Sequence, residues 1–178
     1  ARNCMLRGAD VTLVTGQTSI EKPRFVNIVP IESAREMFEE VTGRAPEQDI
    51  IIKAAAVADY TPITVNTEKT KKKEGEASIA LKRTTDILSW LGEHKEKGQF
   101  LCGFSMETEN MLENSKKKLE KKHADMIVAN NLKVAGAGFG TDTNVVTLIT
   151  KEGAKELPIQ TKDEVSYEIL NEIMNKMA

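Results

Sequence analysis

The chain has 178 residues, of which 40% are hydrophobic and 29% charged, and its formal net charge at pH 7 is −2. This length and balance predict one soluble globular domain, spanning 1–178, with a sizeable buried core. The near-neutral charge argues against the broad basic field that binding to duplex nucleic acid requires. Basic residues are nevertheless clustered at 69–73 and at 116–122, a pattern that suits a small anionic ligand better than a polymer.

The cysteines and histidines are isolated from one another. Cys4 and Cys102 form no CxxC motif, and neither His94 nor His123 has the spacing of a metal partner. The spacing argues against a zinc site and a disulfide framework, and it favours a reducing, cytoplasmic location. No apolar run approaches the 18 residues of a membrane span, and no signal peptide is recognisable.

The opening stretch ARNCMLRGADVTLVTG predicts the end of a helix, a turn and a strand. Gly8 has the place of the glycine that follows a helix C-terminus, and the strand is expected over about 10–15. No initiator methionine is present, so we expect the chain to enter within a helix.

Strands and helices are predicted to alternate along the chain. Near-continuous apolar runs are typical of strands that are covered on both faces. These runs lie at 11–15, 25–29, 49–57, 100–105 and 125–130. The helices are expected from the capping box Ser33–Glu36 to about Val41, from Thr85 or Asp86 to Leu91, over 110–123 with Met111, Leu112, Ser115 and Leu119 facing inward, and over 162–177.

This alternation predicts an α/β fold with a doubly wound, mostly parallel, Rossmann-like sheet and helices on both faces. The segments 145–150 and 154–160 predict an added hairpin, either at the edge of the sheet or as an arm that pairs subunits. The segment 58–84 is a long excursion with one weak strand at 78–83. A loop of this length is usually functional or disordered.

Ligands of open α/β sheets bind beyond the carboxyl ends of the strands, which directs attention to Asp59, Phe104 and Asn130. Asp59 follows small residues, and it either holds Mg²⁺ on a phosphate or serves as an ordinary loop or capping residue. The cluster 69–73 either binds an anion or is a solvated loop.

Lys118 and Lys122 are four residues apart on a helix, so they share one face. GAGFGTD (136–142) lacks the full GxGxxG spacing and leads into a strand, which argues against a dinucleotide-binding loop. Cys102 lies within an apolar strand and is predicted to belong to the core.

Together these segments resemble the phosphopantothenate–cysteine ligase family of coenzyme A biosynthesis. The resemblance covers nearly the whole chain. It is carried by the order and spacing of ADVTLVTG, KAAAVADYTP followed by EKTKK, RTTDIL, GFSMET, KKLEKKHADMIVANN and FGTDTNVVTLI.

The resemblance implies a two-step reaction. The carboxylate of 4′-phosphopantothenate attacks the α-phosphate of CTP, and the amine of cysteine then displaces CMP from the acyl-cytidylate. It implies Mg²⁺ at Asp59 and a catalytic lysine, Lys69, that neutralises the triphosphate. It also implies a set of nucleotide-contacting residues: Lys53, Ala54, Ala55, Asp59, Lys69, Thr85, Asp86, Ile87, Leu88, Phe104, Lys118 and Lys122.

Members of this family pair as homodimers, which points to 136–160 as the pairing element, and many are fused to a flavin-dependent decarboxylase that carries FMN. The family's first strand, its glycine-rich turn and an Asn-containing loop are expected upstream of residue 1. This chain alone is therefore expected to bind nucleotide and to catalyse poorly. Three hypotheses stay open at this point: a CTP- or ATP-dependent ligase domain, a non-catalytic nucleotide-binding module, and a subunit-pairing domain.

Overall fold

A computed structural model describes residues 1–65, 68–69, 78–107, 110–131 and 140–178. The helices are α1 (Arg2–Leu6), α2 (Ala34–Arg44), a 3₁₀ turn η1 (Ala45–Glu47), α3 (Ile87–Glu93), α4 (Met111–Lys121) and α5 (Lys162–Met177). The strands are β1 (Thr12–Thr15), β2 (Asn27–Pro30), β3 (Ile50–Lys53), β4 (Tyr60–Pro62), β5 (Leu81–Arg83), β6 (Phe100–Glu107), β7 (Met126–Asn131), β8 (Thr143–Asn144), β9 (Val146–Thr150), β10 (Ala154–Glu156) and β11 (Gln160–Thr161).

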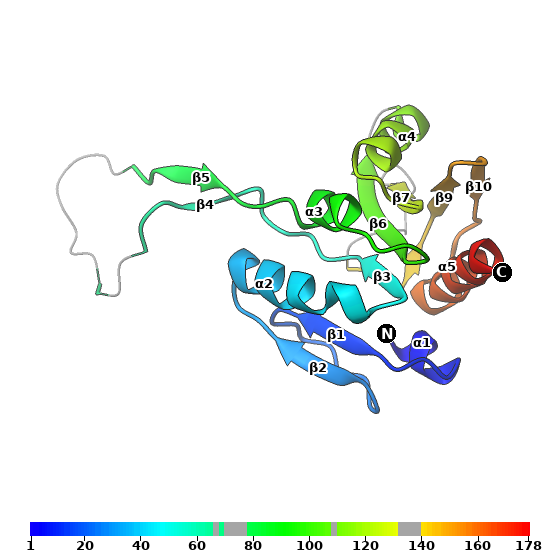
Figure 1. Cartoon of the computed structure of the whole chain (residues 1–178), viewed down its shortest axis with the longest axis horizontal. Helices are drawn as coiled ribbons and strands as arrows, with labels where there is room; N and C mark the ends of the chain where they lie inside the picture. The colour runs from blue at the N-terminus through cyan, green and yellow to red at the C-terminus, as the bar shows by residue number, and fades with distance from the viewer. Residues whose placement is uncertain (66–67, 70–77, 108–109, 132–139) are drawn as a thin grey trace.

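The centre of the molecule is a five-stranded sheet in the order β10-β9-β7-β6-β3 (Figure 1). The strands β3, β6 and β7 run parallel, whereas β9 runs antiparallel to β7 and β10 antiparallel to β9. The predicted α/β fold is thus confirmed. The predicted hairpin is also confirmed, and it extends the edge of the sheet.

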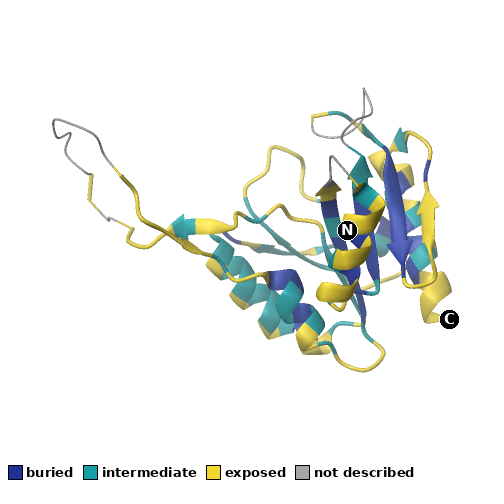
Figure 2. Cartoon of the chain, turned by 90° about the horizontal axis from the view of Figure 1, so that it is seen from above, coloured by how far each residue is buried: buried dark blue, intermediate teal, exposed yellow. Residues whose placement is uncertain are grey.

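Helices cover both faces of this sheet and divide the core into two layers. On one face α2, α3 and α4 pack on Leu101 and Ile127. On the other face α5 packs on Met126, Val128 and Leu148. Figure 2 shows the buried strands between these layers. Because alternate side chains of a strand point to opposite faces, a strand that is apolar throughout contributes to both layers.

The strands β1 and β2 form a separate parallel pair, which corrects the expectation of one continuous sheet. The pair aligns Leu13 with Ile28 and Val14 with Val29, and within the described residues no strand pairing links it to β3. The side chains of β1 and β3 are only half-buried, whereas those of β9 are fully buried. The predicted strand at 25–29 also begins later, at Asn27, because Phe25 has a left-handed backbone (φ 59°) and is 88% exposed.

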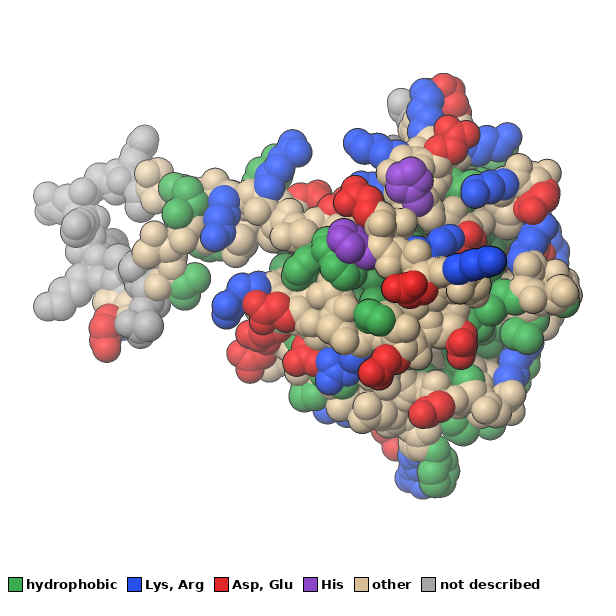
Figure 3. All heavy atoms as spheres, in the orientation of Figure 1, with side chains coloured by type: hydrophobic (Ala, Val, Ile, Leu, Met, Phe, Trp, Pro, Cys, Tyr) green, Lys and Arg blue, Asp and Glu red, His purple; other side chains and the backbone are tan. Residues whose placement is uncertain are grey.

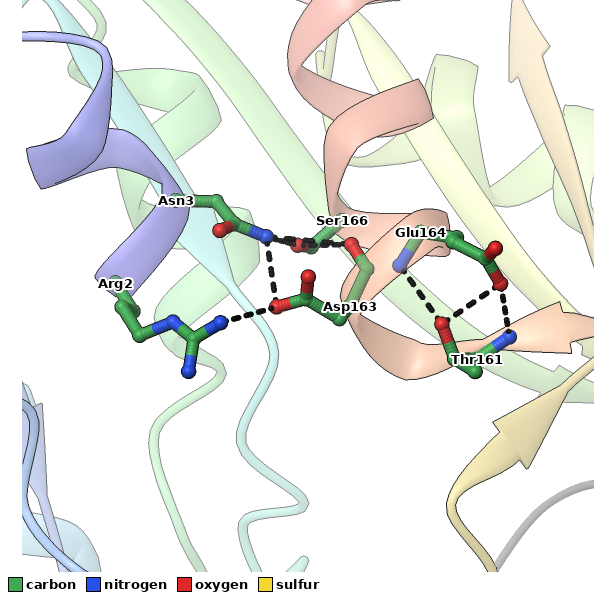
Figure 4. Close-up of polar contacts among 6 residues, drawn as sticks. All are labelled: Arg2, Asn3, Thr161, Asp163, Glu164 and Ser166. Carbon is green, nitrogen blue, oxygen red and sulfur yellow. Dashed lines mark hydrogen bonds and ion pairs between the residues drawn. The ribbon is translucent and has the colours of Figure 1, made fainter.

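The short helix α1 is held against α5 by side-chain hydrogen bonds (Figure 4). The buried amide of Asn3 donates to the carbonyl and the carboxylate of Asp163, both at 3.2 Å, and to the hydroxyl of Ser166. A helix of five residues is unstable alone, so these contacts fix its position. Gly8 then adopts φ 87° in the turn that follows the C-cap residue Arg7, as its place in the sequence predicts.

The described parts of the excursion, 58–65 and 78–84, form an arm that extends away from the body of the molecule (Figure 1). At its base β4 and β5 pair antiparallel, with Tyr60 opposite Arg83 and Pro62 opposite Leu81. The sequence predicted only the second of these strands. Figure 2 shows that most of the described arm is exposed.

Two further expectations are corrected. Leu112 is 47% exposed and does not belong to the inward stripe of α4, in which Ser115 and Leu119 are buried. The predicted strand 49–57 ends at Lys53, and Ala54 to Ala56 are exposed.

No helix in the described part of the chain is long and apolar enough to cross a lipid bilayer.

We predict that Asn3→Ala lowers the free energy of unfolding by about 1–3 kcal/mol, because it removes the hydrogen bonds by which the buried Asn3 amide holds α1 on α5. Arg2→Ala is the matched control. Its ion pair with the same Asp163 joins side chains that are 65% and 53% exposed, so a loss below about 0.5 kcal/mol is expected. Urea unfolding of both variants checks this, and equal losses would contradict the anchoring role of Asn3.

Candidate nucleotide-binding cleft

The parallel strands β3, β6 and β7 end at one edge of the sheet, and a cleft of about 360 Å³ lies there. This volume is in the range of small-ligand sites. Its lining comes from the segment after β3, from the start of α3, from the end of β6 and from α4. The lining residues are Lys53, Ala54, Ala55, Ala56, Val57, Asp59, Thr84, Thr85, Asp86, Ile87, Leu88, Phe104, Ser105, Met106, Lys118, Lys122 and Asn130.

Every predicted nucleotide-contacting residue except Lys69 lines this cleft. Residues that are far apart in the sequence, from Lys53 to Asn130, meet here because parallel strands bring their carboxyl ends together. The predicted set of contacts omitted six lining residues, Ala56, Val57, Thr84, Ser105, Met106 and Asn130, of which Asn130 had been singled out only as a strand end. A signal for Thr84 existed, since it directly precedes the predicted helix cap, whereas nothing in the sequence distinguishes Met106.

The small residues after β3 form one wall of the cleft. Ala54, Ala55 and Ala56 are exposed, so their methyl groups leave room for a ligand to approach the backbone. A run of alanines that looked like a buried strand is therefore part of the site.

Lys53 ends β3 with its ammonium group half-buried in the cleft, where it donates to the carbonyl of Ala55 at 2.7 Å. Burial lowers the pKa of this lysine, the nearby Lys118 lowers it further, and the carboxylates of Asp86 and Asp59 oppose both effects. An anionic ligand would restore the balance of charge around Lys53.

The start of α3 is capped by Asp86, whose carboxylate accepts from the backbone N–H of Ser89 at 2.9 Å. Its second oxygen accepts from the ammonium group of Lys122 at 2.6 Å. Burial acts to raise the pKa of Asp86, but these two hydrogen bonds and the charges of Lys122 and Lys53 together outweigh it and hold the pKa below the usual range. Asp86 and Lys122 thus neutralise each other at the wall of the cleft.

The floor of the cleft is formed by β6. Gly103 allows Leu88 of α3 to pack closely, because a Cβ atom at Gly103 would lie 2.6 Å from the Leu88 Cδ2 atom. Phe104 is half-buried, lines the cleft and packs against the core layer on the α5 side of the sheet. On the other face of the sheet the buried hydroxyls of Ser105 and Ser115 share a hydrogen bond of 3.0 Å, which fixes α4 on the sheet.

The base of the arm closes one side of the cleft. Thr84 donates its backbone N–H to the carbonyl of Asp59 at 2.9 Å and its hydroxyl to the carbonyl of Ala58 at 2.6 Å. These bonds join the two strands of the arm where they leave the body. The Asp59 carboxylate lines the cleft, with no hydrogen bond or ion pair to another described residue.

Lys69 lies farther along the arm, is exposed, and does not line the cleft. Its neighbours Lys71, Lys72 and Lys73 lie outside the described residues. Figure 3 shows further Lys and Arg side chains on the described arm, which carries Lys82 and Arg83 on β5.

The prediction that Cys102 belongs to the core is confirmed. Its side chain is buried among Met126 and Val128, and burial raises the pKa of the thiol far above its usual range, so the thiolate is not formed at neutral pH.

A second hollow lies at the opposite edge of the sheet, beside Gly98, Asp125 and Lys176. Its main charges are already paired: Lys176 with Glu152 at 3.0 Å, and Asp125 with Lys95 at 2.7 Å. These pairs leave less charge for a ligand to neutralise than the cleft at the carboxyl edge offers.

Comparisons with known proteins support the family that the motifs indicate. Residues 1–177 match the family described as "DNA/pantothenate metabolism flavoprotein C-terminal domain". The coenzyme A biosynthesis bifunctional protein CoaBC of Bacillus subtilis is 49% identical over 168 residues, which cover 93% of this chain and 41% of that protein. The chain therefore spans about two fifths of the length of this relative.

Solved structures agree with this match. A crystal structure of the C-terminal domain of a CoaBC protein has a TM-score of 0.82 and 45% identity, and the match covers 99% of this chain and 80% of that one. A Cab2 mutant in complex with phosphopantothenate-cysteine shares the fold, with a TM-score of 0.67 at 15% identity over 85% of this chain and 53% of that one. Given the match over almost its full length, the chain belongs to the DNA/pantothenate metabolism flavoprotein C-terminal domain family.

Proposed function

We propose that this chain is the ligase domain that joins 4′-phosphopantothenate to L-cysteine in coenzyme A biosynthesis, with CTP as the activating nucleotide. The observation that carries the proposal is the cleft at the carboxyl edge of the sheet, whose lining includes the lysines Lys53, Lys118 and Lys122 and the aromatic residue Phe104. The relatives named CoaBC and the fold shared with a protein that binds phosphopantothenate-cysteine support it.

The chemistry needs neutralisation of charge more than an acid or a base. A carboxylate oxygen of phosphopantothenate attacks the α-phosphorus of CTP, pyrophosphate leaves, and an acyl-cytidylate forms. The cysteine amine then attacks the acyl carbon and CMP leaves. Both steps build negative charge on phosphate oxygens, which fixed ammonium groups stabilise.

Two lysines have ammonium groups that are available to bind the phosphates of the nucleotide. Lys118 is half-buried on α4, and its ammonium group has no hydrogen-bond or ion-pair partner in the part of the chain that the structure describes. Among the described residues, the Lys53 ammonium group donates only to the backbone carbonyl of Ala55. Lys69 is proposed as the catalytic lysine, which the arm brings to the triphosphate when it closes over the cleft.

The residues present fit a Mg²⁺ ion that is shared with the nucleotide. Mg²⁺ is commonly held by one or two carboxylates together with phosphates, and Asp59 supplies one carboxylate at the cleft. When bound there, Mg²⁺ would withdraw charge from the phosphate oxygens. Among the described residues no cluster of three or more His, Cys, Asp or Glu could hold a metal without the nucleotide.

The wider setting follows from the relatives. We propose that the domain works in the cytoplasm as a homodimer, fused in its longer relatives to a flavin-dependent decarboxylase half that binds FMN. The bifunctional name of the Bacillus subtilis relative and the decarboxylase name of another relative, 43% identical over 169 residues (94% of this chain, 47% of that protein), support the fusion.

Two alternatives remain. A ligase of the same family that uses ATP would need the same phosphate contacts, so only the nucleotide preference separates it. A non-catalytic nucleotide-binding or pairing module would bind nucleotide, or only dimerise, without releasing pyrophosphate.

The ligase proposal is tested by the release of pyrophosphate from CTP or ATP in the presence of Mg²⁺ and phosphopantothenate, with and without cysteine. We expect release with CTP, and CMP formation that depends on cysteine, in a chain extended at its N-terminus as in the CoaBC relatives. This chain alone is expected to bind CTP and to turn over slowly. An extended chain that releases no pyrophosphate from either nucleotide would exclude the ligase.

In the extended chain, Lys69→Gln should lower the rate of pyrophosphate release at least about tenfold, since a charge-neutralising contact in the transition state is lost. The matched control is Lys73→Gln, which alters a lysine of the same cluster and is expected to change the rate less than about twofold. Stopped assays at saturating CTP compare the two. Similar losses in both would show that Lys69 has no special role.

Dimerisation through the 136–160 element is expected to use the free edge of β10. Leu157 donates to Val146 of β9, so the N–H of Glu156 faces outward, where a second copy could pair. Glu156→Pro should therefore convert a dimer into a 19.7 kDa monomer in sedimentation equilibrium. Leu81→Glu, on the exposed apolar arm, is the control. Dissociation by Leu81→Glu alone would place the interface on the arm.

A further inference from the structure

The N-cap residue of α3 and two residues within α3, at intervals of three, contact one and the same residue at the end of the neighbouring helix. Asp86, Ser89 and Gly92 lie along one face of α3, and all three meet Lys122, the C-cap residue of α4. Asp86 and Lys122 line the cleft, whereas Ser89 and Gly92 lie outside its lining.

Gly92 allows the backbones of the two helices to approach closely. A Cβ atom at this position would lie 1.8 Å from the carbonyl oxygen of Lys122 and 2.8 Å from its carbonyl carbon. The atoms in the way belong to the backbone, so they cannot move aside as the end of a side chain can. The backbone of Gly92 does not have the positive φ that favours glycine. A glycine is therefore required here because there is no room for a Cβ atom, and not because of the backbone conformation.

Ser89 holds the other end of the same residue. The ammonium group of Lys122 donates to the Ser89 hydroxyl at 2.9 Å and to the Asp86 carboxylate at 2.6 Å, and the Lys122 side chain is only 13% exposed. A lysine side chain has many rotamers in solution, so two acceptors and close packing are needed to keep its charge at one point. The Ser89 hydroxyl contributes to this without facing the cleft.

We propose that Ser89 and Gly92 are positioning residues for the nucleotide site. Gly92 sets the distance between α3 and α4, and Ser89 fixes the Lys122 ammonium group at the wall of the cleft, next to the α3 residues that line it. This inference rests on the proposed binding of a nucleotide in the cleft.

The test measures CTP binding and folding separately on this chain. Ser89→Ala should raise the dissociation constant for CTP, by calorimetry, about fivefold, the effect of one lost hydrogen bond. The urea midpoint should stay nearly unchanged, because the cap of α3 uses the backbone N–H of Ser89, which alanine keeps. Ser89→Thr restores a hydroxyl and should recover most of the affinity.

Gly92→Ala should weaken CTP binding further, about tenfold or more, since α3 must move away from α4. Its matched control is Gly43→Ala in α2, where a Cβ atom meets nothing within 4 Å, so CTP affinity should not change. If Gly92→Ala does not fold, Ser89→Ala and Ser89→Thr decide the question alone.

The outcomes separate the two proposals. Binding of CTP by the unaltered chain, with unchanged affinity in folded Ser89→Ala and Gly92→Ala, would overturn the positioning role and leave the nucleotide site intact. Failure of Ser89→Thr to recover affinity that Ser89→Ala has lost would also overturn it. No binding of CTP or ATP by the unaltered chain would overturn the proposed function, and the positioning role with it.

Discussion

The parallel hydrogen-bond ladder of β3, β6 and β7 is the constraint on which the rest of the structure depends. It aligns Lys53 with Gly103, and Phe104 with Val128, so that these strands end at one edge. Parallel strands need crossover helices, and these put α3 and α4 side by side over one face of the sheet. The cleft, its alanine wall, its aromatic side chain and its lysines follow from that arrangement, because each belongs to a strand end or to the start or end of a helix.

The lysines of the cleft differ in whether their ammonium group already has a carboxylate partner, and this difference suggests different roles for them. Lys122 is neutralised and held by Asp86, and its burial makes that pairing firm. Within the described residues the ammonium groups of Lys118 and Lys53 have no carboxylate partner in hydrogen-bond contact, so the phosphates of a nucleotide can bind them. Without a fixed Lys122, α3 would lose its main polar tie to α4, and the residues at its start would lose their place in the cleft.

Much of the fold follows from local patterns in the sequence. The predicted cap Ser33, and Asp86 of the two predicted candidates Thr85 and Asp86, are local signals, and α2 and α3 begin directly after them. The helix predicted from 162 begins there as α5, where the structure shows a capping box of Thr161 and Glu164 (Figure 4). The predictions that were wrong concern the surroundings of a residue in space, namely its exposure and its neighbouring strands. Alanines are apolar wherever they lie, so the pattern alone could not tell the wall of a cleft at 54–56 from a buried strand. The local pattern also could not predict β4, which contains only Tyr60, Thr61 and Pro62. It forms a strand because it pairs with β5.

The sequence by itself determined the order of strands and helices, the residue types at the strand ends and the family motifs, since all of these are properties of neighbours along the chain. Only the tertiary structure decided which of those residues share a site. It paired Lys122 with Asp86 across 36 positions, left Lys118 and Asp59 open at the cleft, and placed Lys69 on the arm outside its lining. It also showed that Gly92 has to be a glycine. The physical reason is that packing and charge pairing depend on distances in space, and these are set by the sheet register and by the close approach of α3 to α4.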